Sequence, residues 1–178
     1  MYHHVAIAAK DIERSHRFYT EAMGFTLVKV VKRQAFGGES AGWTKHIFYD
    51  TGDGSLFALW DLHLSAIGED DWRAGFSRGM GLPLWINHIA FEVETLEQLE
   101  EKKRVWLDYG LRVTEVDHDF IRSIYTIDPD KTMVEWTVKT RVLTADDHAE
   151  ADELLADNSP ATIPDYEGEA FEPTASPA

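Results

Sequence analysis

The sequence contains no cysteine among its 178 residues. This absence excludes a disulfide scaffold, a thiolate metal site and a cysteine nucleophile, and it fits a reducing compartment. Long apolar runs are also missing, so no segment reaches the length that spans a bilayer as a helix. Residues 1–11 place no basic stretch before their short apolar run, which does not fit a secretory signal. We therefore expect a cytoplasmic protein that does not span a membrane.

Positive charge is scarce, above all near the end of the chain. Residues 144–178 hold ten acidic residues and no Lys or Arg, within a chain whose formal net charge is −15. Binding to nucleic acid or to an anionic membrane needs clustered positive charge, so this composition argues against both partners. Most of the acidity belongs to this tail and says little about the rest of the molecule.

The remaining chain reads as one pattern that occurs twice. Residues 4–10 predict a strand, Asp11 an N-cap, and Gly24 the end of a helix, with β-rich runs at 25–33, 44–51 and 55–62. A strand from Asn87, an N-cap at Thr95 and a helix end at Gly110 repeat the order, followed by strands at 123–128 and 132–139. Such internal similarity favours two βαβββ modules in an α+β fold.

We expect four segments along the chain: a first module at 1–62, a linker at 63–84, a second module at 85–141, and an acidic region at 142–178. The acidic region has the pattern of one helix capped by Thr144. Beyond Asn158 it is rich in Pro, acids and small residues, which predicts a disordered tail.

Three residues at related places in the two modules form a candidate metal site. His4 and His88 each stand seven residues before a helix N-cap, and alignment of the last strands places Ala58 opposite Glu135. A carboxylate facing a sheet interior needs a cation or several donors. Two imidazoles and one carboxylate suit a divalent transition metal and leave coordination positions open for chemistry. His3 points to the opposite face of its strand and is the weaker candidate.

On these residues the two halves resemble the vicinal oxygen chelate superfamily, which includes glyoxalase I, extradiol dioxygenases, fosfomycin-resistance transferases and bleomycin-binding proteins. The resemblance covers about residues 1–140. It implies paired βαβββ modules that form a curled mixed β-sheet barrel around a metal held by His4, His88 and Glu135. Glyoxalase I and methylmalonyl-CoA epimerase, another member of the superfamily, have a fourth ligand where this chain has Ala58, which weakens the interpretation as an isomerase or epimerase.

The segment "HDFIRSIYTIDPDKTMVEW" resembles the signature of the extradiol dioxygenases. His118, Tyr125, Asp128-Pro129 and Glu135 fall at the spacing of that signature, and Lys131 stands where Gly or Pro is usual. By resemblance, Tyr125 donates a hydrogen bond to a catecholate oxygen, and His118 lies at the pocket rim and helps to bind substrate or to transfer protons. Glycine would permit a positive φ at position 131, so we expect the lysine to alter the geometry of this turn.

The resemblance implies Fe(II), with Mn(II), Zn(II), Ni(II) or Co(II) open, and a catechol-like substrate together with O₂. The family's distal catalytic His has no counterpart at its usual distance before His88, and His63 and His46 are the nearest candidates. Aromatic residues are available for a substrate pocket: Trp43, Phe48, Trp60, Trp85 and Phe91.

Other activities of the same scaffold remain open. One is a glyoxalase-like lyase or isomerase. A second is a fosfomycin-type thiol transferase, for which the cationic candidates are scattered: Lys45, Arg73, Arg78, Arg122 and Lys131. A third is a non-catalytic resistance protein that binds a small molecule. Family members pair their modules within one chain or across a homodimer, and both arrangements fit the sequence.

Overall fold

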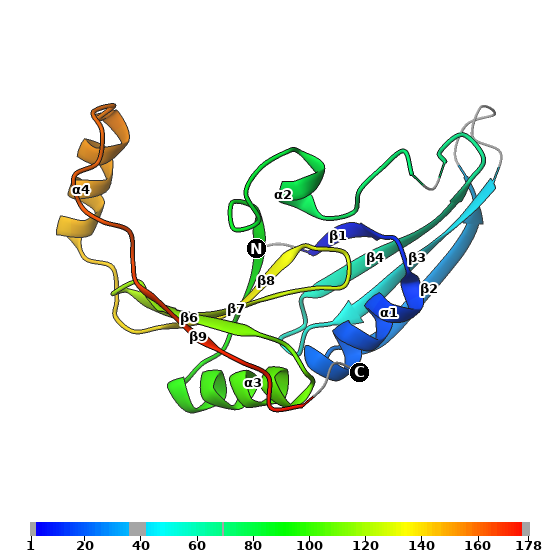
Figure 1. Cartoon of the computed structure of the whole chain (residues 1–178), viewed down its shortest axis with the longest axis horizontal. Helices are drawn as coiled ribbons and strands as arrows, with labels where there is room; N and C mark the ends of the chain where they lie inside the picture. The colour runs from blue at the N-terminus through cyan, green and yellow to red at the C-terminus, as the bar shows by residue number, and fades with distance from the viewer. Residues whose placement is uncertain (1–2, 36–41, 69, 176–178) are drawn as a thin grey trace. The chain divides into compact units, whose positions relative to one another are not determined.

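The computed structural model describes residues 3–35, 42–68 and 70–175, and it contains both expected βαβββ modules (Figure 1). The elements of the first module are β1 (His4–Ala9), α1 (Ile12–Arg17) with a following π-helical turn η1 (Phe18–Ala22), β2 (Thr26–Gln34), β3 (Gly42–Asp50) and β4 (Leu56–Leu64). The short helix α2 (Phe76–Gly79) precedes the second module, which comprises β5 (His88–Glu92), α3 (Leu96–Asp108), β6 (Val113–Asp117), β7 (Ile121–Ile127) and β8 (Met133–Lys139). The tail adds α4 (Ala145–Ala156) and β9 (Gly168–Phe171).

The strands of the first module form a four-stranded sheet in the order β1-β4-β3-β2. β1 runs parallel to β4, with His4 beside Leu56, and the other pairs are antiparallel. One face of the sheet packs against α1 and η1 (Figure 1), where Tyr19 lies 4.3 Å from Phe57 between ring centroids. Both of these rings are fully buried, so this face is the core of the module.

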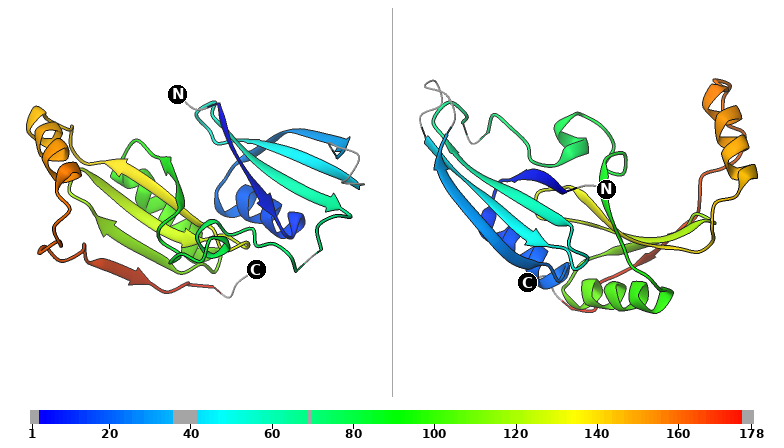
Figure 2. Two further views of the ribbon diagram at one scale, coloured as in Figure 1. Left: turned by 90° about the horizontal axis from the view of Figure 1, so that it is seen from above. Right: turned by 180° about the vertical axis from the view of Figure 1, so that it is seen from behind.

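The second sheet repeats the same strand order and extends it by one strand, as β5-β8-β7-β6-β9. Its helix α3 buries Leu99 and Trp106. β9 pairs antiparallel with β6, so the tail adds a strand at this edge (Figure 2). The repeated order confirms that the two halves of the sequence have the same architecture.

The helix ends form where the sequence predicts them. Asp11 accepts hydrogen bonds from the backbone N–H groups of Glu13 and Arg14, and Thr95 accepts one from Gln98. Gly24 and Gly110 follow the helices with φ of 78° and 91°, a conformation that costs glycine little.

Two expectations need correction. The sheets are open rather than closed into a barrel, because in the described residues each ends in edge strands, β1 and β2 in one and β5 and β9 in the other. In addition, Gly168–Phe171 of the tail that was expected to be disordered forms β9.

Backbone contacts divide the chain into two compact units. One extends to Ile89 and includes Ile127–Val134, and the other contains Ala90–Thr126 together with residues 135–175. The turn between β7 and β8 therefore belongs to the first unit, whereas most of the strands that it joins belong to the second. Among the described helices, none combines the length and the apolar character that a membrane span requires.

Candidate functional site

The three expected metal ligands all lie on strands. His4 begins β1 and His88 begins β5, both exposed and both in the first unit, whereas Glu135 lies within β8 in the second unit and is 2% exposed. In the part of the chain that the structure describes, no three His, Asp or Glu side chains are grouped so that they would hold a metal ion. The convergence of His4, His88 and Glu135 thus stays a prediction.

The chemistry of this donor set fits a divalent transition metal. Nδ1 of His88 lies 3.2 Å from the backbone oxygen of Trp85, which can only accept a hydrogen bond. The contact therefore places the imidazole proton on Nδ1 and the ligating lone pair on Nε2, as in many metal-bound histidines. Nδ1 of His4 lies 2.8 Å from Nδ1 of His3, so His3 contacts the candidate ligand directly.

His4 shares its face of the first sheet with a group of aromatic side chains. Strand register puts His4, Ala58 and Trp60 on this face together with His46 and Phe48 of β3. The ring of His4 lies 5.9 Å from that of His46 and 5.6 Å from that of Phe48, between centroids. We call this face, defined by these five residues, the His4 face.

His46 is the polar residue at the centre of the His4 face. Its ring stacks on Trp60 at 3.8 Å with an interplanar angle of 11°, and it lies 4.1 Å from Phe48. Its Nε2 is buried without a hydrogen-bond partner among the described residues. Burial, and next the neighbouring His4, lower the pKa of His46, so the neutral imidazole is favoured.

His63, the other candidate for a distal histidine, lies on the opposite face of the same sheet. It stacks on Trp43 at 3.6 Å, and its Nε2 lies 3.0 Å from the carboxylate of Asp61. Lys45 also binds Asp61, at 2.8 Å. Burial acts to raise the pKa of Asp61, but the hydrogen bonds from Lys45 and His63 outweigh it and hold that pKa below its usual value. His63 and Trp43 are therefore separated from His4 by the sheet.

In the second unit, His118, Tyr125 and Glu135 form a chain of polar contacts. Nε2 of His118 lies 2.9 Å from the hydroxyl of Tyr125, and a side-chain hydrogen bond links Tyr125 to the buried Glu135. Burial raises the pKa of Tyr125 to about 12, and the charge of Glu135 contributes in the same direction. Tyr125 therefore keeps its proton at neutral pH and stays a hydrogen-bond donor. The resemblance to the dioxygenase signature predicts these residues as a set, and the structure brings them together.

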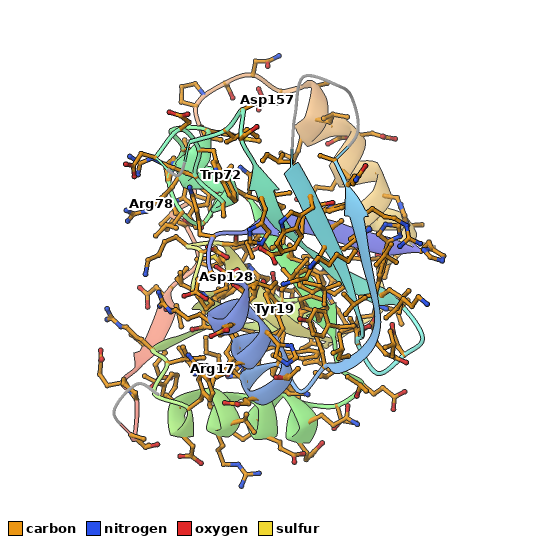
Figure 3. All side chains as sticks on the ribbon, turned by 90° about the vertical axis from the view of Figure 1, so that its right-hand side faces the viewer. Arg17, Tyr19, Trp72, Arg78, Asp128 and Asp157 are labelled. Carbon is orange, nitrogen blue, oxygen red and sulfur yellow. The ribbon has the colours of Figure 1, made fainter. Side chains whose placement is uncertain are left out.

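The turn between Tyr125 and Glu135 is held by a buried aspartate. Asp128 is 1% exposed and accepts hydrogen bonds from the Tyr19 hydroxyl at 2.9 Å and from the backbone N–H of Thr132 at 2.7 Å. Figure 3 shows Tyr19 and Asp128 next to each other. Asp130 accepts from Ser15, at 2.9 Å, and from the backbone of Lys10. The Asp-Pro-Asp motif thus fixes the turn to α1 and η1 of the first unit, a role that the sequence pattern does not reveal.

Lys131 adopts the left-handed conformation with φ of 71°. Its position is the one where the dioxygenase signature usually has glycine, and the structure keeps the glycine-like backbone despite the lysine side chain. The substitution therefore introduces strain without removing the turn.

The remaining candidate side chains are dispersed. Trp85 is 61% exposed, and Phe91 packs 5.5 Å from Trp136 in the second unit. Among the cationic candidates, Lys45 pairs with Asp61, and Arg122 pairs with Glu115 at 2.8 Å. Only Phe48 and Trp60 of the five candidate pocket aromatics lie on the His4 face in the described structure.

Comparison with known proteins agrees with this architecture. Residues 2–138 match the family model of the Glyoxalase/Bleomycin resistance protein/Dioxygenase superfamily. A superfamily domain from Frankia sp. EAN1pec superposes with a TM-score of 0.58 at 19% identity, covering 78% of this chain and 97% of that one. Lactoylglutathione lyase from Agrobacterium tumefaciens gives 0.52 at 17% identity, covering 78% and 92%. A fosfomycin resistance protein from Listeria monocytogenes gives 0.51 at 17% identity, covering 79% and 93%.

The chain is a paired βαβββ protein, and it belongs to the Glyoxalase/Bleomycin resistance protein/Dioxygenase superfamily. This confirms the resemblance inferred from the sequence. At these identities the structural likenesses show the fold alone. A search of curated proteins found no match. Members of the superfamily are often enzymes, typically bind divalent metals, and act on or bind small molecules.

Proposed function

We propose that this protein is a metal-dependent dioxygenase that cleaves the ring of a catechol-type aromatic next to its hydroxyl groups, with Fe(II) held by His4, His88 and Glu135. The observation that carries the proposal is the contact chain from His118 through Tyr125 to Glu135. The Tyr125 phenol stays protonated and lies beside the buried Glu135 carboxylate. A catechol bound to a metal at Glu135 would need a hydrogen-bond donor such as Tyr125 for its hydroxyl oxygen.

The bound metal would orient both reactants and allow electron density to pass from the catechol to O₂. The chain's own residues then have distinct tasks. The Tyr125 hydroxyl has one proton, which it donates to the Glu135 carboxylate in the metal-free protein; with a metal on that carboxylate, the same proton would be donated to the substrate oxygen instead. The Oη of Tyr125 lies 2.9 Å from Nε2 of His118. Because these two groups are already in contact, they can relay a proton: Oη of Tyr125 accepts it from the substrate while the hydroxyl gives its own proton to an unprotonated Nε2 of His118.

His46 supplies the polar group of the His4 face in this proposal. Its buried Nε2 is directed by stacking against Trp60 and is available to hydrogen-bond a ligand that enters. Phe48 and Trp60 offer planar apolar surface of the kind that binds an aromatic ring. We therefore assign the distal histidine role to His46 rather than to His63.

The other activities have less support. Ala58 is fully buried on the His4 face, and a methyl group there provides neither the fourth ligand nor the proton carrier of a glyoxalase-like lyase. A fosfomycin-type thiol transferase needs convergent cations for a phosphonate, whereas Lys45 and Arg122 are each engaged by a carboxylate. A sequestering protein would need no stoichiometric metal.

The first test measures metal content and oxygen uptake. Protein purified without air and loaded with Fe(II) is expected to bind one metal per chain and to consume O₂ with at least one member of a panel of catechols, forming coloured ring-cleavage products. Bound metal without oxygen uptake would favour a lyase or transferase. Protein that binds the small molecules but no metal would favour sequestration.

The second test addresses the ligand set. Glu135→Gln keeps the shape of the side chain but removes the ligand charge, so metal affinity is expected to fall on the order of tenfold or more. Glu169→Gln, which changes an exposed carboxylate of β9, is the matched control and should bind metal like the wild type. Equal metal affinity in the Glu135 variant and the wild type would contradict the assignment.

The third test separates the two histidines. His46→Gln is expected to lower kcat by about a hundredfold, the usual range for a lost acid–base group. His63→Gln changes the opposite face of the same sheet and should leave kcat nearly unchanged. Similar losses in both variants would show that the effect comes from the sheet and not from the His4 face.

A further inference from the structure

The acidic tail is attached to the second unit at defined points. Four residue pairs join β9 to β6, from Val113 beside Phe171 to Val116 beside Gly168. Gly168 lies so close that an added Cβ would be 3.0 Å from the Thr114 side chain. The segment after residue 167 is therefore fitted to the sheet rather than merely adjacent to it.

Contacts on either side of β9 strengthen this attachment. Nζ of Lys103 lies 4.4 Å from the ring centre of Phe171, and Arg112 pairs with Glu172 at 3.1 Å. Further along, Thr174 donates hydrogen bonds through its backbone N–H to the Leu107 oxygen, at 3.0 Å, and through its hydroxyl to Asp108, at 2.6 Å. Side-chain and backbone groups of the second module thus bind the residues of the tail at and beyond the C-terminal end of β9.

Tyr166 precedes β9 by two residues and packs on the candidate site. Its ring lies 4.7 Å from the ring of His118, between centroids, with an interplanar angle of 75°. His118 in turn contacts Tyr125 at 2.9 Å, and Tyr125 is hydrogen-bonded to Glu135. The tail therefore provides the outermost member of this series of side chains.

We propose that residues 166–174 form a C-terminal strap whose Tyr166 positions the His118 imidazole against the Tyr125 hydroxyl. The effect on turnover rests on the proposed function, whereas the positioning itself does not. β9 and its flanking contacts hold the strap, and the T-shaped contact with the Tyr166 ring restricts the rotation of His118. Tyr166 is a positioning residue, since it acts through His118.

The strap does not include the intervening helix α4. None of its residues is buried, and the apolar side chain of Ile163 beyond it is 84% exposed. Ile163 therefore gives a control position within the same tail.

The test compares Tyr166→Ala, Tyr166→Phe and the control Ile163→Ala. In metal-free protein, we expect nuclear Overhauser contacts between the ring protons of His118 and Tyr125, and a ring-current shift of the His118 signals. Both should be lost in Tyr166→Ala and retained in Tyr166→Phe and Ile163→Ala, because a phenyl ring preserves the edge-to-face contact. Tyr166→Leu, which keeps more apolar volume, serves if the alanine variant loosens β9, as judged by thermal unfolding.

In Fe(II)-loaded protein that turns over a catechol, kcat should fall about two- to tenfold in Tyr166→Ala, the equivalent of one aromatic edge-to-face contact, and recover in Tyr166→Phe. Unchanged His118 signals in Tyr166→Ala would overturn the strap. Changed signals with unchanged kcat would overturn its role in turnover. If the wild type shows no turnover, the proposed function fails, and the metal-free spectra still decide on the strap.

Discussion

Replacing Asp128 by asparagine is expected to change how stability depends on pH. Burial raises the pKa of this carboxyl group to about 6, although hydrogen bonds from Thr132, Tyr19 and Asp130 act against it. The ordinary value is about 3.9, and a difference of about two pH units corresponds to about 3 kcal/mol. Because the pKa is higher in the folded than in the unfolded protein, the protonated carboxyl of Asp128 favours the folded state. This contribution to the free energy of unfolding is fully present below the ordinary pKa and is lost as the pH rises through about 6.

The amide side chain of the Asp128→Asn variant would keep an oxygen for the backbone donors at Thr132 and Asp130, while its nitrogen would face the Tyr19 hydroxyl. This side chain carries no charge at any pH, so the desolvation penalty of the carboxylate disappears. From pH 5 to pH 8 the stability of Asp128→Asn, measured relative to the wild type, should therefore rise by about 1.4 kcal/mol.

Urea unfolding at half-unit pH steps from 5 to 8 measures this difference, with the midpoint multiplied by a common slope. Subtraction of the two curves cancels the titrating groups that do not interact with Asp128. Asp130 is not among them, because its charge helps to raise the pKa of Asp128. Tyr19→Phe is the control, since the loss of its hydrogen bond should raise the pKa of Asp128 further and move the transition to higher pH. A constant or falling difference would show that the hydrogen bonds to Asp128 outweigh its burial.

Three further changes test the backbone and helix ends. Lys131→Gly should raise the free energy of unfolding by about 1 kcal/mol, because glycine adopts φ of 71° without strain; an unchanged midpoint in urea would refute this. Gly75→Ala should lower the free energy of unfolding by about 1–3 kcal/mol, because the new Cβ would lie 2.7 Å from the backbone oxygens of Asp130 and Lys131. An unchanged free energy of unfolding would mean that the turn can shift to accommodate the methyl group. Thr95→Ala should cost about 1 kcal/mol by removing the acceptor for the Gln98 N–H, and thermal unfolding that matches the wild type would count against that role.

The modules were predictable because their signals are local. Asp11 and Thr95 cap helices through their own side chains, and Gly24 and Gly110 end them in a left-handed conformation, so a few neighbouring residues determine each boundary. His4 and His88 are then recognised as equivalent positions, because each lies seven residues before the N-cap of its helix.

The features that the sequence did not reveal depend on pairing between distant strands. The side of the sheet on which His46 lies is fixed by its register with Trp60, and that register is visible only once β3 and β4 are paired. β9 has four residues without a distinctive pattern, so its pairing with β6, and the contact of Tyr166 with His118, have no local signal. The closed barrel failed as a prediction for the same reason, because closure depends on how edge strands meet.

The parallel pairing of β1 with β4 has a consequence for synthesis on the ribosome. His4 is made before the strand that holds its own strand in place, since β1 pairs with Leu56 and the residues after it, about fifty positions later. β1 must therefore wait, unpaired, until the last strand of its module has left the exit tunnel. Slower translation between β1 and β4 would therefore prolong the exposure of the apolar segment β1. His4 reaches its position in the sheet only after the last strand of its module has been made.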